Sequence, residues 1–247
     1  MPLMDEFEAQ GNWLFRRRSF LPLLGVPLIV LAFQQFSYPW GSRTYDMVWD
    51  MLCFLVSLVG LSMRVYTAGY APRRTSGRNT RKGQVADSLN TSGIYSAVRH
   101  PLYLGNFLTA LGLAMFFRVW WMTLLYTLLF WLYYERIMLA EEAFLRSKFG
   151  EEYLNWASRT PAFLPRFSNW RSPNLRFSWR TAIKREYQTL FVIVTTFFVF
   201  DTVADTIVER HLDVEPLWSV LFVISLLFFV VIRVVRKKTK LLSVEGR

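Results

Sequence analysis

The stretch PLYLGNFLTALGLAMFFRVWWMTLLYTLLFWLYY, residues 101–134, contains a single charged residue, Arg118. An apolar stretch of this length suits the hydrocarbon of a membrane, where a spanning helix needs roughly 20 apolar residues. Each half, Leu102–Phe117 and Val119–Tyr134, is short for that role. We therefore expect a tight helical hairpin, interrupted only at Arg118 and shielded by other helices.

The rest of the chain has the same apolar character. Its 247 residues are 53% hydrophobic and 17% aromatic but only 19% charged, and the formal net charge is +11. A soluble domain rarely carries so much apolar material, so the composition indicates an integral membrane protein rather than a nucleic-acid binder. We expect an all-α fold with about six transmembrane helices: Phe20–Tyr38, Asp46–Met63, Leu102–Phe117, Val119–Tyr134, Tyr187–Val208 and Glu215–Val235.

Lysine and arginine are concentrated in four regions outside these segments. They precede the first span at 16–18, crowd the loops 64–101 and 135–186, and close the chain in RVVRKKTK, residues 233–240. An even number of spans places all four regions on one side, which the positive-inside rule makes cytoplasmic. Acidic residues precede the first arginines and no small-residue cleavage site follows, so we expect a retained first span rather than a signal peptide.

The two basic loops divide the chain into three parts. Residues 1–63 hold the first two spans, 64–186 the hairpin and both loops, and 187–247 the last two spans and the tail. No strand–turn–helix pattern carries GxGxxG, which argues against a Rossmann domain. With two histidines and one cysteine, Cys53, we expect no zinc site and no metal among the functional residues.

The segment SGIYSAVRHPLYLGN, residues 92–106, joins the first basic loop to the hairpin. Pro101 suits the first turn of a helix, which puts His100 near the N-cap and Arg99 just outside it. Cations are unfavourable at a helix N-terminus unless an anion is bound there, so these residues predict a carboxylate or phosphate site. Three rings offer faces for an adenine or a sulfonium cation: Tyr95, His100 and Tyr103. A role of Arg99 and His100 as topology signals alone remains open.

A second candidate group is the glutamate pair Glu141 and Glu142 in ERIMLAEEAFLRSKFGEEYLNW, residues 135–156. At 100° per residue Glu141 falls inside an apolar arc and Glu142 at its edge. The arc consists of Ile137, Met138, Phe144, Leu145 and Phe149. A carboxylate there is costly unless it is paired or holds a cation. An ion pair with Lys148 remains an alternative, and we expect the later pair, 151–152, to be solvated.

A third acidic group is the row Asp201, Asp205 and Glu209, spaced by four residues and therefore on one helix face. Ionisable residues in a span are functional candidates by default. This row lies near the non-cytoplasmic end, away from the other two groups. We therefore favour pairing with Arg210 or His211, or exposure at the membrane surface.

Three segments together resemble a known family: GIYSAVRHPLYLGN (93–106), EEAFLRSKFGEEYLNW (141–156) and RTPAFLPRF (159–167). They are similar to the membrane methyltransferases of the isoprenylcysteine carboxyl methyltransferase and phospholipid methyltransferase group, over about residues 90–168. The resemblance implies S-adenosylmethionine as methyl donor, bound without a Rossmann fold between the cytoplasmic helix ends. It assigns to cofactor binding Tyr95, Arg99, His100, Pro101, Tyr103, Gly105, Glu141 and Glu142. Of these, Arg99, His100 and Glu142 are the expected catalytic residues.

The chemistry narrows the acceptor. Methyl transfer is an in-line displacement on a carbon that the sulfonium already activates, so the protein mainly aligns the reactants and excludes water. A carboxylate or phosphate oxygen needs no base, and we expect such an anionic nucleophile on a membrane lipid. The stretch TSGRNTRKGQVADSLNTSGIYS, residues 75–96, looks like bacterial members that methylate a phosphate of lipid A. We expect four residues in or next to it to bind that substrate: Arg74, Arg78, Asn79 and Arg81. A topology role for these arginines remains open.

The same resemblance places the protein in a bacterial inner membrane, with termini and active site on the cytoplasmic side. The helix pair after residue 186 would widen the lipid-facing wall or form a homodimer contact, and the sequence leaves both open. Three rival functions remain: isoprenylcysteine carboxyl methylation, reduction with NADPH as in sterol reductases, and a non-catalytic channel or scaffold. The intact RHPLYLGN, the short chain and the glutamate pair favour the methyl donor over NADPH.

Overall fold

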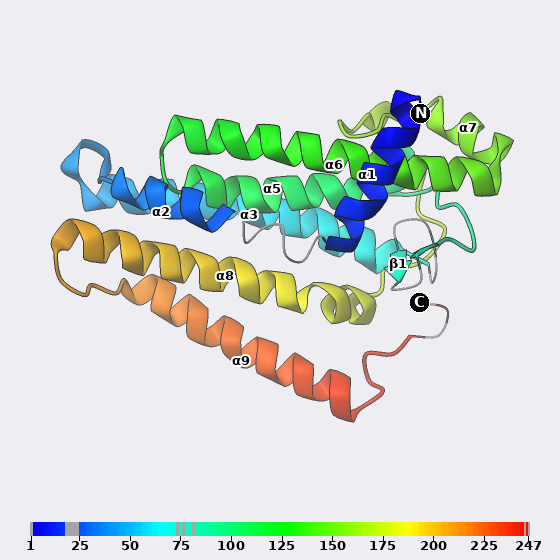
Figure 1. Ribbon diagram of the computed structural model, residues 1–247. Helices are drawn as coiled ribbons and strands as arrows, with labels where there is room; N and C mark the ends of the chain where they lie inside the picture. Colours follow the sequence, from blue (N-terminus) through cyan, green and yellow to red (C-terminus); the bar gives the residue numbers. More distant parts are fainter. Residues whose placement is uncertain are drawn as a thin grey trace.

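The computed structural model describes residues 2–17, 25–72, 75, 78–80, 83–244 and 246. Nearly all regular structure there is helical, and the long helices run side by side (Figure 1). In chain order the α-helices are α1 Leu3–Arg17, α2 Val26–Gln34, α3 Arg43–Tyr70, α4 Ile94–Ala97, α5 Pro101–Met115, α6 Trp120–Phe149, α7 Glu151–Ala157, α8 Trp179–Glu209 and α9 Pro216–Lys238. Short 3₁₀ turns at Pro39–Gly41 and Phe167–Asn169 and a hairpin of β1 Arg78–Thr80 with β2 Gly83–Val85 complete the order.

The helices confirm an all-α integral membrane protein. Within the described ranges α3, α8 and α9 are long and apolar enough to cross a membrane, and α5 is a shorter apolar helix. Helices α3 and α8 contain the second and fifth predicted spans. Helices α5 and α9 match the third and sixth to within a few residues. The number six stays a prediction, because two of the expected spans differ from the structure.

The first predicted span, Phe20–Tyr38, is not one continuous helix. Residues 18–24 lie outside the described part, and α2 supplies nine residues, about 14 Å at 1.5 Å per residue. The chain leaves the helix at Gln35, whose side-chain oxygen accepts a hydrogen bond from Trp121 Nε1 at 3.1 Å. Pro39 and the left-handed Trp40 (φ 48°) then turn it into α3. A polar side-chain contact and a tight turn thus end the described helix four residues before the predicted span ends.

The predicted hairpin forms, but its second helix is longer than expected. Arg118, with φ 58°, turns the chain between α5 and α6. Instead of ending at Tyr134, α6 continues to Phe149, because residues 135–149 contain strong helix formers and neither glycine nor proline. Gly150, with φ 51°, ends the helix and begins α7. The glutamate pair therefore lies on the same rigid rod as the hairpin.

Close packing of α3 on α5 orders the bundle. A Cβ on Gly60 would collide with the backbone of Thr109, and one on Gly112 would collide with the backbone of Cys53 and Ser57. Small residues let two membrane helices approach closely. The Ser57 hydroxyl donates to the Thr109 carbonyl oxygen at 2.8 Å across this contact.

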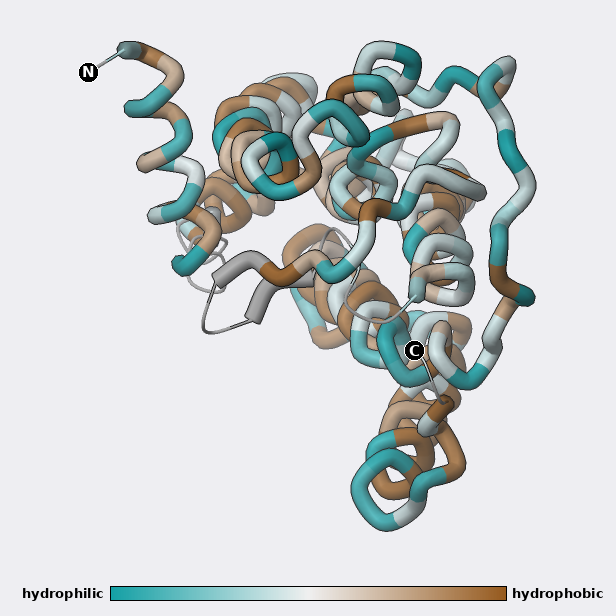
Figure 2. Tube along the Cα trace, turned by 90° about the vertical axis from the view of Figure 1, so that its right-hand side faces the viewer, coloured by the Kyte–Doolittle hydropathy of each residue, from teal (hydrophilic) through white to brown (hydrophobic). Residues whose placement is uncertain are grey.

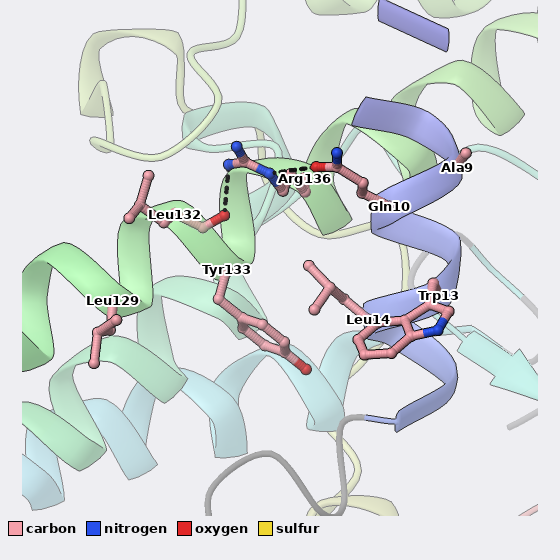
Figure 3. Close-up of a pocket in the computed structure, with 8 residues that line it drawn as sticks. All are labelled: Ala9, Gln10, Trp13, Leu14, Leu129, Leu132, Tyr133 and Arg136. Atoms are coloured by element: carbon pink, nitrogen blue, oxygen red, sulfur yellow. Dashed lines mark hydrogen bonds between the residues drawn. The ribbon is translucent and has the colours of Figure 1, made fainter. Parts of the chain in front are cut away.

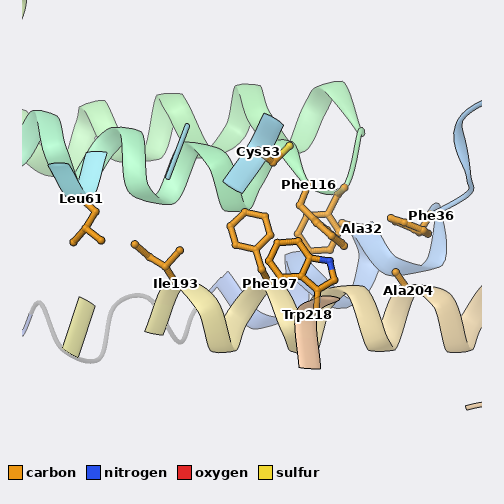
Figure 4. Packing of buried hydrophobic residues seen from close by; sticks show 10 residues of the cluster. Ala32, Phe36, Cys53, Leu61, Phe116, Ile193, Phe197, Ala204 and Trp218 are labelled. Carbon is orange, nitrogen blue, oxygen red and sulfur yellow. The ribbon is translucent and has the colours of Figure 1, made fainter. Parts of the chain in front are cut away.

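Aromatic residues fill the core between these helices and α8, as Figure 4 shows. Phe197 stacks on Trp218 at 5.4 Å between ring centroids, and Phe116 packs edge-on against Phe117 at 5.4 Å. By contrast α9 leaves Val220, Ile224 and other large apolar side chains exposed, and its turns form the brown lower part of Figure 2. An outward apolar face of this kind fits contact with lipid.

Candidate active site

Backbone hydrogen bonds hold the segment before α5 against the proline-rich tail after α7. Arg99 N–H donates to the Pro161 carbonyl at 2.9 Å, and Arg166 N–H donates to the Ala97 carbonyl at 2.9 Å. The motif RTPAFLPRF therefore acts as a strap that fixes the strand-like residues leading into α5. This packing puts His100 at the N-cap position with Pro101 as the first helical residue, as the sequence predicts.

The structure brings five of the predicted cofactor residues together at this helix start. Glu142 accepts from His100 Nε2 at 2.8 Å and from Arg99 Nη1 at 3.1 Å. Glu141 accepts from the Tyr103 hydroxyl at 2.8 Å and lies 3.6 Å from His100 Nδ1. The rings of His100 and Tyr103 stack with centroids 5.4 Å apart. Two glutamates of α6 and two basic residues just before α5 thus form one charge-paired group, in which His100 and Glu141 are buried and Arg99 and Glu142 half-buried.

Charge pairing shifts the pKa values of His100 and Glu142 in opposite directions. Burial disfavours the charged imidazole, but hydrogen bonds to Glu141 and Glu142 outweigh it and raise the pKa of His100 above its usual value. Burial likewise works against the ionised form of Glu142, but His100 and Arg99 outweigh it and lower the pKa of that carboxyl. Both shifts favour the imidazolium form of His100 and the carboxylate form of Glu142.

Two polar groups beside Glu142 leave capacity for a ligand. The buried Nε of Arg99 has no hydrogen-bond partner, and the Tyr153 hydroxyl lies next to Glu142 and Arg99 without the alignment of a hydrogen bond. Burial, followed by the nearby Glu142, raises the pKa of Tyr153, so its hydroxyl stays neutral. A buried donor without a partner is costly, which fits a polar ligand that completes the group.

The remaining predicted cofactor residues serve the surroundings of this group. Tyr95 is buried, and its carbonyl accepts from Trp156 Nε1 at 3.0 Å. Pro101 is fully buried in the first turn. Gly105 faces α3, where a Cβ would meet the side chain of Arg64 at 2.7 Å, so its role is to make room for that arginine.

Arg64 leads to a polar network that the sequence reasoning missed. Its guanidinium donates to Glu186 at 2.8 Å, and it also contacts the Asn106 side-chain oxygen. Asn106 in turn donates to the Tyr134 hydroxyl at 3.0 Å, and the Tyr134 ring lies 4.9 Å from that of Tyr103. In the sequence Arg64 is the first residue of the basic loop 64–101, which predicts only the orientation of the helices in the membrane. The sequence does contain a signal for this ion pair. Arg64 directly follows the predicted span Asp46–Met63, and Glu186 directly precedes the predicted span Tyr187–Val208.

Other sequence expectations are settled only in part. Lys148 lies over the rings of Phe144 and Phe149 instead of pairing with a glutamate. Of the expected substrate residues, Arg74 and Arg81 lie outside the described residues. Arg78 and Asn79 belong to β1, and the structure gives only their backbone.

The distal aspartates differ from the expectation. Asp205 is buried rather than exposed, and it accepts from Tyr38 at 3.0 Å and from Arg43 at 3.1 Å. Neither Arg210 nor His211 is its partner, because helix α8 turns this face toward α3. Asp201 is also buried.

Comparisons with known proteins agree with this geometry. A family model described as phospholipid methyltransferase matches residues 52–152, which include both the helix start at His100 and the glutamate pair. The cobalt-zinc-cadmium resistance protein CzcN of Cupriavidus metallidurans is 34% identical over 164 residues, which cover 66% of this chain and 70% of CzcN. The nickel-cobalt-cadmium resistance protein NccN of Alcaligenes xylosoxydans is 30% identical, over 60% of this chain and 67% of that protein.

A third relative carries an enzyme name. The protein-S-isoprenylcysteine O-methyltransferase of Schizosaccharomyces pombe is 40% identical over 77 residues, which cover 31% of this chain and 33% of the yeast protein. No solved structure matches this chain.

Proposed function

Because this chain belongs to the integral membrane methyltransferases related to phospholipid and isoprenylcysteine methyltransferases, we propose that its acceptor is an anionic oxygen of a membrane lipid. The favoured acceptor is a lipid phosphate such as that of lipid A. The enzyme is an S-adenosylmethionine-dependent methyltransferase of the membrane. Its proposed place is a bacterial inner membrane, with the active site on the cytoplasmic side.

The donor would be held by the group at the start of α5. When bound, S-adenosylmethionine supplies a methyl group that its sulfonium activates. The guanidinium of Arg99, with its unpartnered Nε, and the positive end of the helix dipole suit the donor's carboxylate. Glu141 suits its ammonium, and the stacked rings of His100 and Tyr103 suit a flat or cationic part.

One observation supports an anionic acceptor above all: Glu142 is occupied by two cations, at 2.8 and 3.1 Å. A carboxylate held this way is a weak base, and the raised pKa of His100 favours the imidazolium, which cannot accept a proton. The group therefore aligns ligands but is poorly suited to remove a proton from an amine or hydroxyl. A phosphate or carboxylate oxygen arrives deprotonated and needs only alignment and exclusion of water.

An apolar groove beside this group suits the hydrocarbon part of a lipid. It has a volume of about 700 Å³ and lies between α1 and α6 (Figure 3). Leu129, Leu132 and Tyr133 line it from α6, and Trp13 and Leu14 from α1. Arg136 stands at the edge, where it donates to the Gln10 side chain at 2.9 Å and also contacts the Leu132 carbonyl. Tyr133 precedes Glu141 by eight residues, about 12 Å along the helix.

A polar cavity offers a place for the charged head group. It has a volume of about 510 Å³ and is lined by Ser96 and Trp156 from the motif region, with Arg159 from the strap and Arg171 from the segment after it. Two guanidiniums beside hydroxyl groups suit a phosphate. The alternative acceptor, the carboxylate of an isoprenylcysteine, is favoured by the yeast relative and would need fewer cations.

The test offers both acceptors to one preparation. Purified protein with methyl-labelled S-adenosylmethionine is given phosphorylated lipid A, dephosphorylated lipid A and farnesylcysteine in mixed micelles. Label is expected on phosphorylated lipid A alone. Label on farnesylcysteine alone would show that the acceptor is the prenylcysteine carboxylate and not a lipid phosphate. Methyl transfer to dephosphorylated lipid A would refute an anionic acceptor. Mass spectrometry of membrane lipids with and without the protein should show one added methyl group on the same lipid.

A further inference from the structure

A second group of carboxylates lies at the end of the bundle away from the candidate active site. Asp46 and Asp50 of α3 and Asp201 of α8 each place a carboxylate oxygen within 4.8 Å of the others. Their exposed fractions are 3%, 0% and 5%. Figure 1 shows why they meet: the start of α3 and the end of α8 lie together at the end opposite α7 and β1. Asp50 precedes Arg64 by fourteen residues, about 21 Å along α3.

The described residues supply this trio with too little positive charge. Arg118 lies 2.6 Å from Asp46 and 3.8 Å from Asp50. Arg118 lies in the turn between α5 and α6, and its guanidinium is 4.3 Å from the centroid of the Phe36 ring. Among the described residues Asp201 has no ion-pair partner, and its buried Oδ2 has no hydrogen-bond partner. Within the same part of the chain both oxygens of Asp50 also lack a hydrogen bond.

The neighbouring Asp205, in contrast to Asp201, has hydrogen-bond donors for its carboxylate among the described residues. One helical turn from Asp201, it receives Tyr38 at 3.0 Å and Arg43 at 3.1 Å. Arg43 also pairs with Asp213 at 2.6 Å and with Glu215 at 3.0 Å, so three carboxylates already share it. Among the described residues the trio therefore has Arg118 as its one ion-pair partner, beside three carboxylates.

We propose that Asp46, Asp50 and Asp201 bind a divalent cation. An ionised carboxylate without a cationic partner is costly to bury, and one divalent ion would balance two such carboxylates. The unpartnered, buried oxygens of Asp201 and Asp50 are its ligands. Because the donors are all carboxylate oxygens, the site favours a hard cation such as Mg²⁺, Mn²⁺ or Ca²⁺.

The experiment uses Mn²⁺ as the probe and does not depend on methyl transfer. Full-length protein in detergent is stripped with a chelator, and Mn²⁺ binding is followed by electron paramagnetic resonance and by the shift in thermal unfolding. The wild type is expected to bind one Mn²⁺ per chain, in competition with Mg²⁺ or Ca²⁺, and to unfold at a higher temperature with it. Asp201→Asn and Asp50→Asn should each weaken binding at least tenfold and remove the thermal shift. Glu209→Gln, an exposed acid on the same helix, should do neither.

Two outcomes would overturn the proposal. Wild-type protein that binds none of the three cations would mean that protons neutralise the trio, and Asp201→Asn would then raise the unfolding temperature in the absence of metal. Binding that both asparagine variants retain would place the cation elsewhere. If one variant does not fold, the wild-type stoichiometry and the other variant still decide.

Discussion

At one end of the bundle Glu142 receives both Arg99 and His100, whereas at the other end the guanidinium of Arg118 lies beside Asp46 and Asp50, and Asp201 has no ion pair among the described residues. Both groups join two helices. The first contains its own cations, and a ligand would complete its polar contacts. The second has three carboxylates and one neighbouring guanidinium. This difference underlies the two proposals, a reaction site at one end and a cation site at the other.

The largest effect is expected from a substitution of Glu142, which pairs with Arg99 and His100 at the candidate active site. Glu142→Gln leaves Arg99 and His100 without their shared carboxylate, and losing one partner of a buried pair costs roughly 3–5 kcal/mol. Methyl transfer should fall about 100-fold or more, with weaker donor binding in calorimetry. Glu151→Gln, an exposed glutamate in α7, is the matched control and should keep the wild-type rate. Wild-type kinetics in Glu142→Gln would show that the pair is structural only.

A substitution in the shared helix contact should weaken both ends together. In Gly112→Ala the new Cβ collides with the backbone of Cys53 and Ser57, so α3 and α5 must move apart. Overpacking of this kind costs about 1–3 kcal/mol. Thermal unfolding should show the loss, and Gly25→Ala, where a Cβ meets nothing within 4 Å, should not. An unchanged unfolding temperature for Gly112→Ala would contradict the close packing of α3 on α5.

A smaller effect should separate the lipid groove from the donor site. Leu132→Ser removes apolar surface from the groove and should raise the KM for a lipid acceptor about three- to tenfold, while donor affinity stays constant. Leu128→Ser is the matched control, because Leu128 is equally exposed on α6 but does not line the groove. Equal effects of the two variants on KM would remove the groove from the substrate path.

The smallest effect is on the pH dependence of stability. The raised pKa of His100 stabilises the fold fully below its usual value of 6.5, and this contribution is lost as pH rises through the raised pKa. The lowered pKa of Glu142 stabilises above its usual 4.5, and that contribution is lost as pH falls through the lowered pKa. The unfolding temperature should therefore show a plateau between pH 4.5 and 6.5 from this pair. His100→Gln should lose the alkaline decline, and an unaltered decline would assign it to another group.

Much of the candidate site could be predicted from local patterns. The proline after His100 fixed a helix start, and the 100° period put Glu141 on a buried face, which the structure confirms. The length of α6 was underestimated because hydropathy drops at Glu135, although helix propensity continues to Phe149. Hydropathy predicts which residues enter lipid, and it is a poor guide to where a helix ends.

The sequence by itself determined that this is a helical membrane protein with a cationic helix start and an acidic pair on a helical face, because periodicity and proline act over a few residues. Only the tertiary structure decided which charges meet. Arg64 reaches Glu186 across 122 residues, and Asp50 meets Asp201 across a longer interval. Such pairings depend on helix register and on close approach at glycines, which no local pattern specifies.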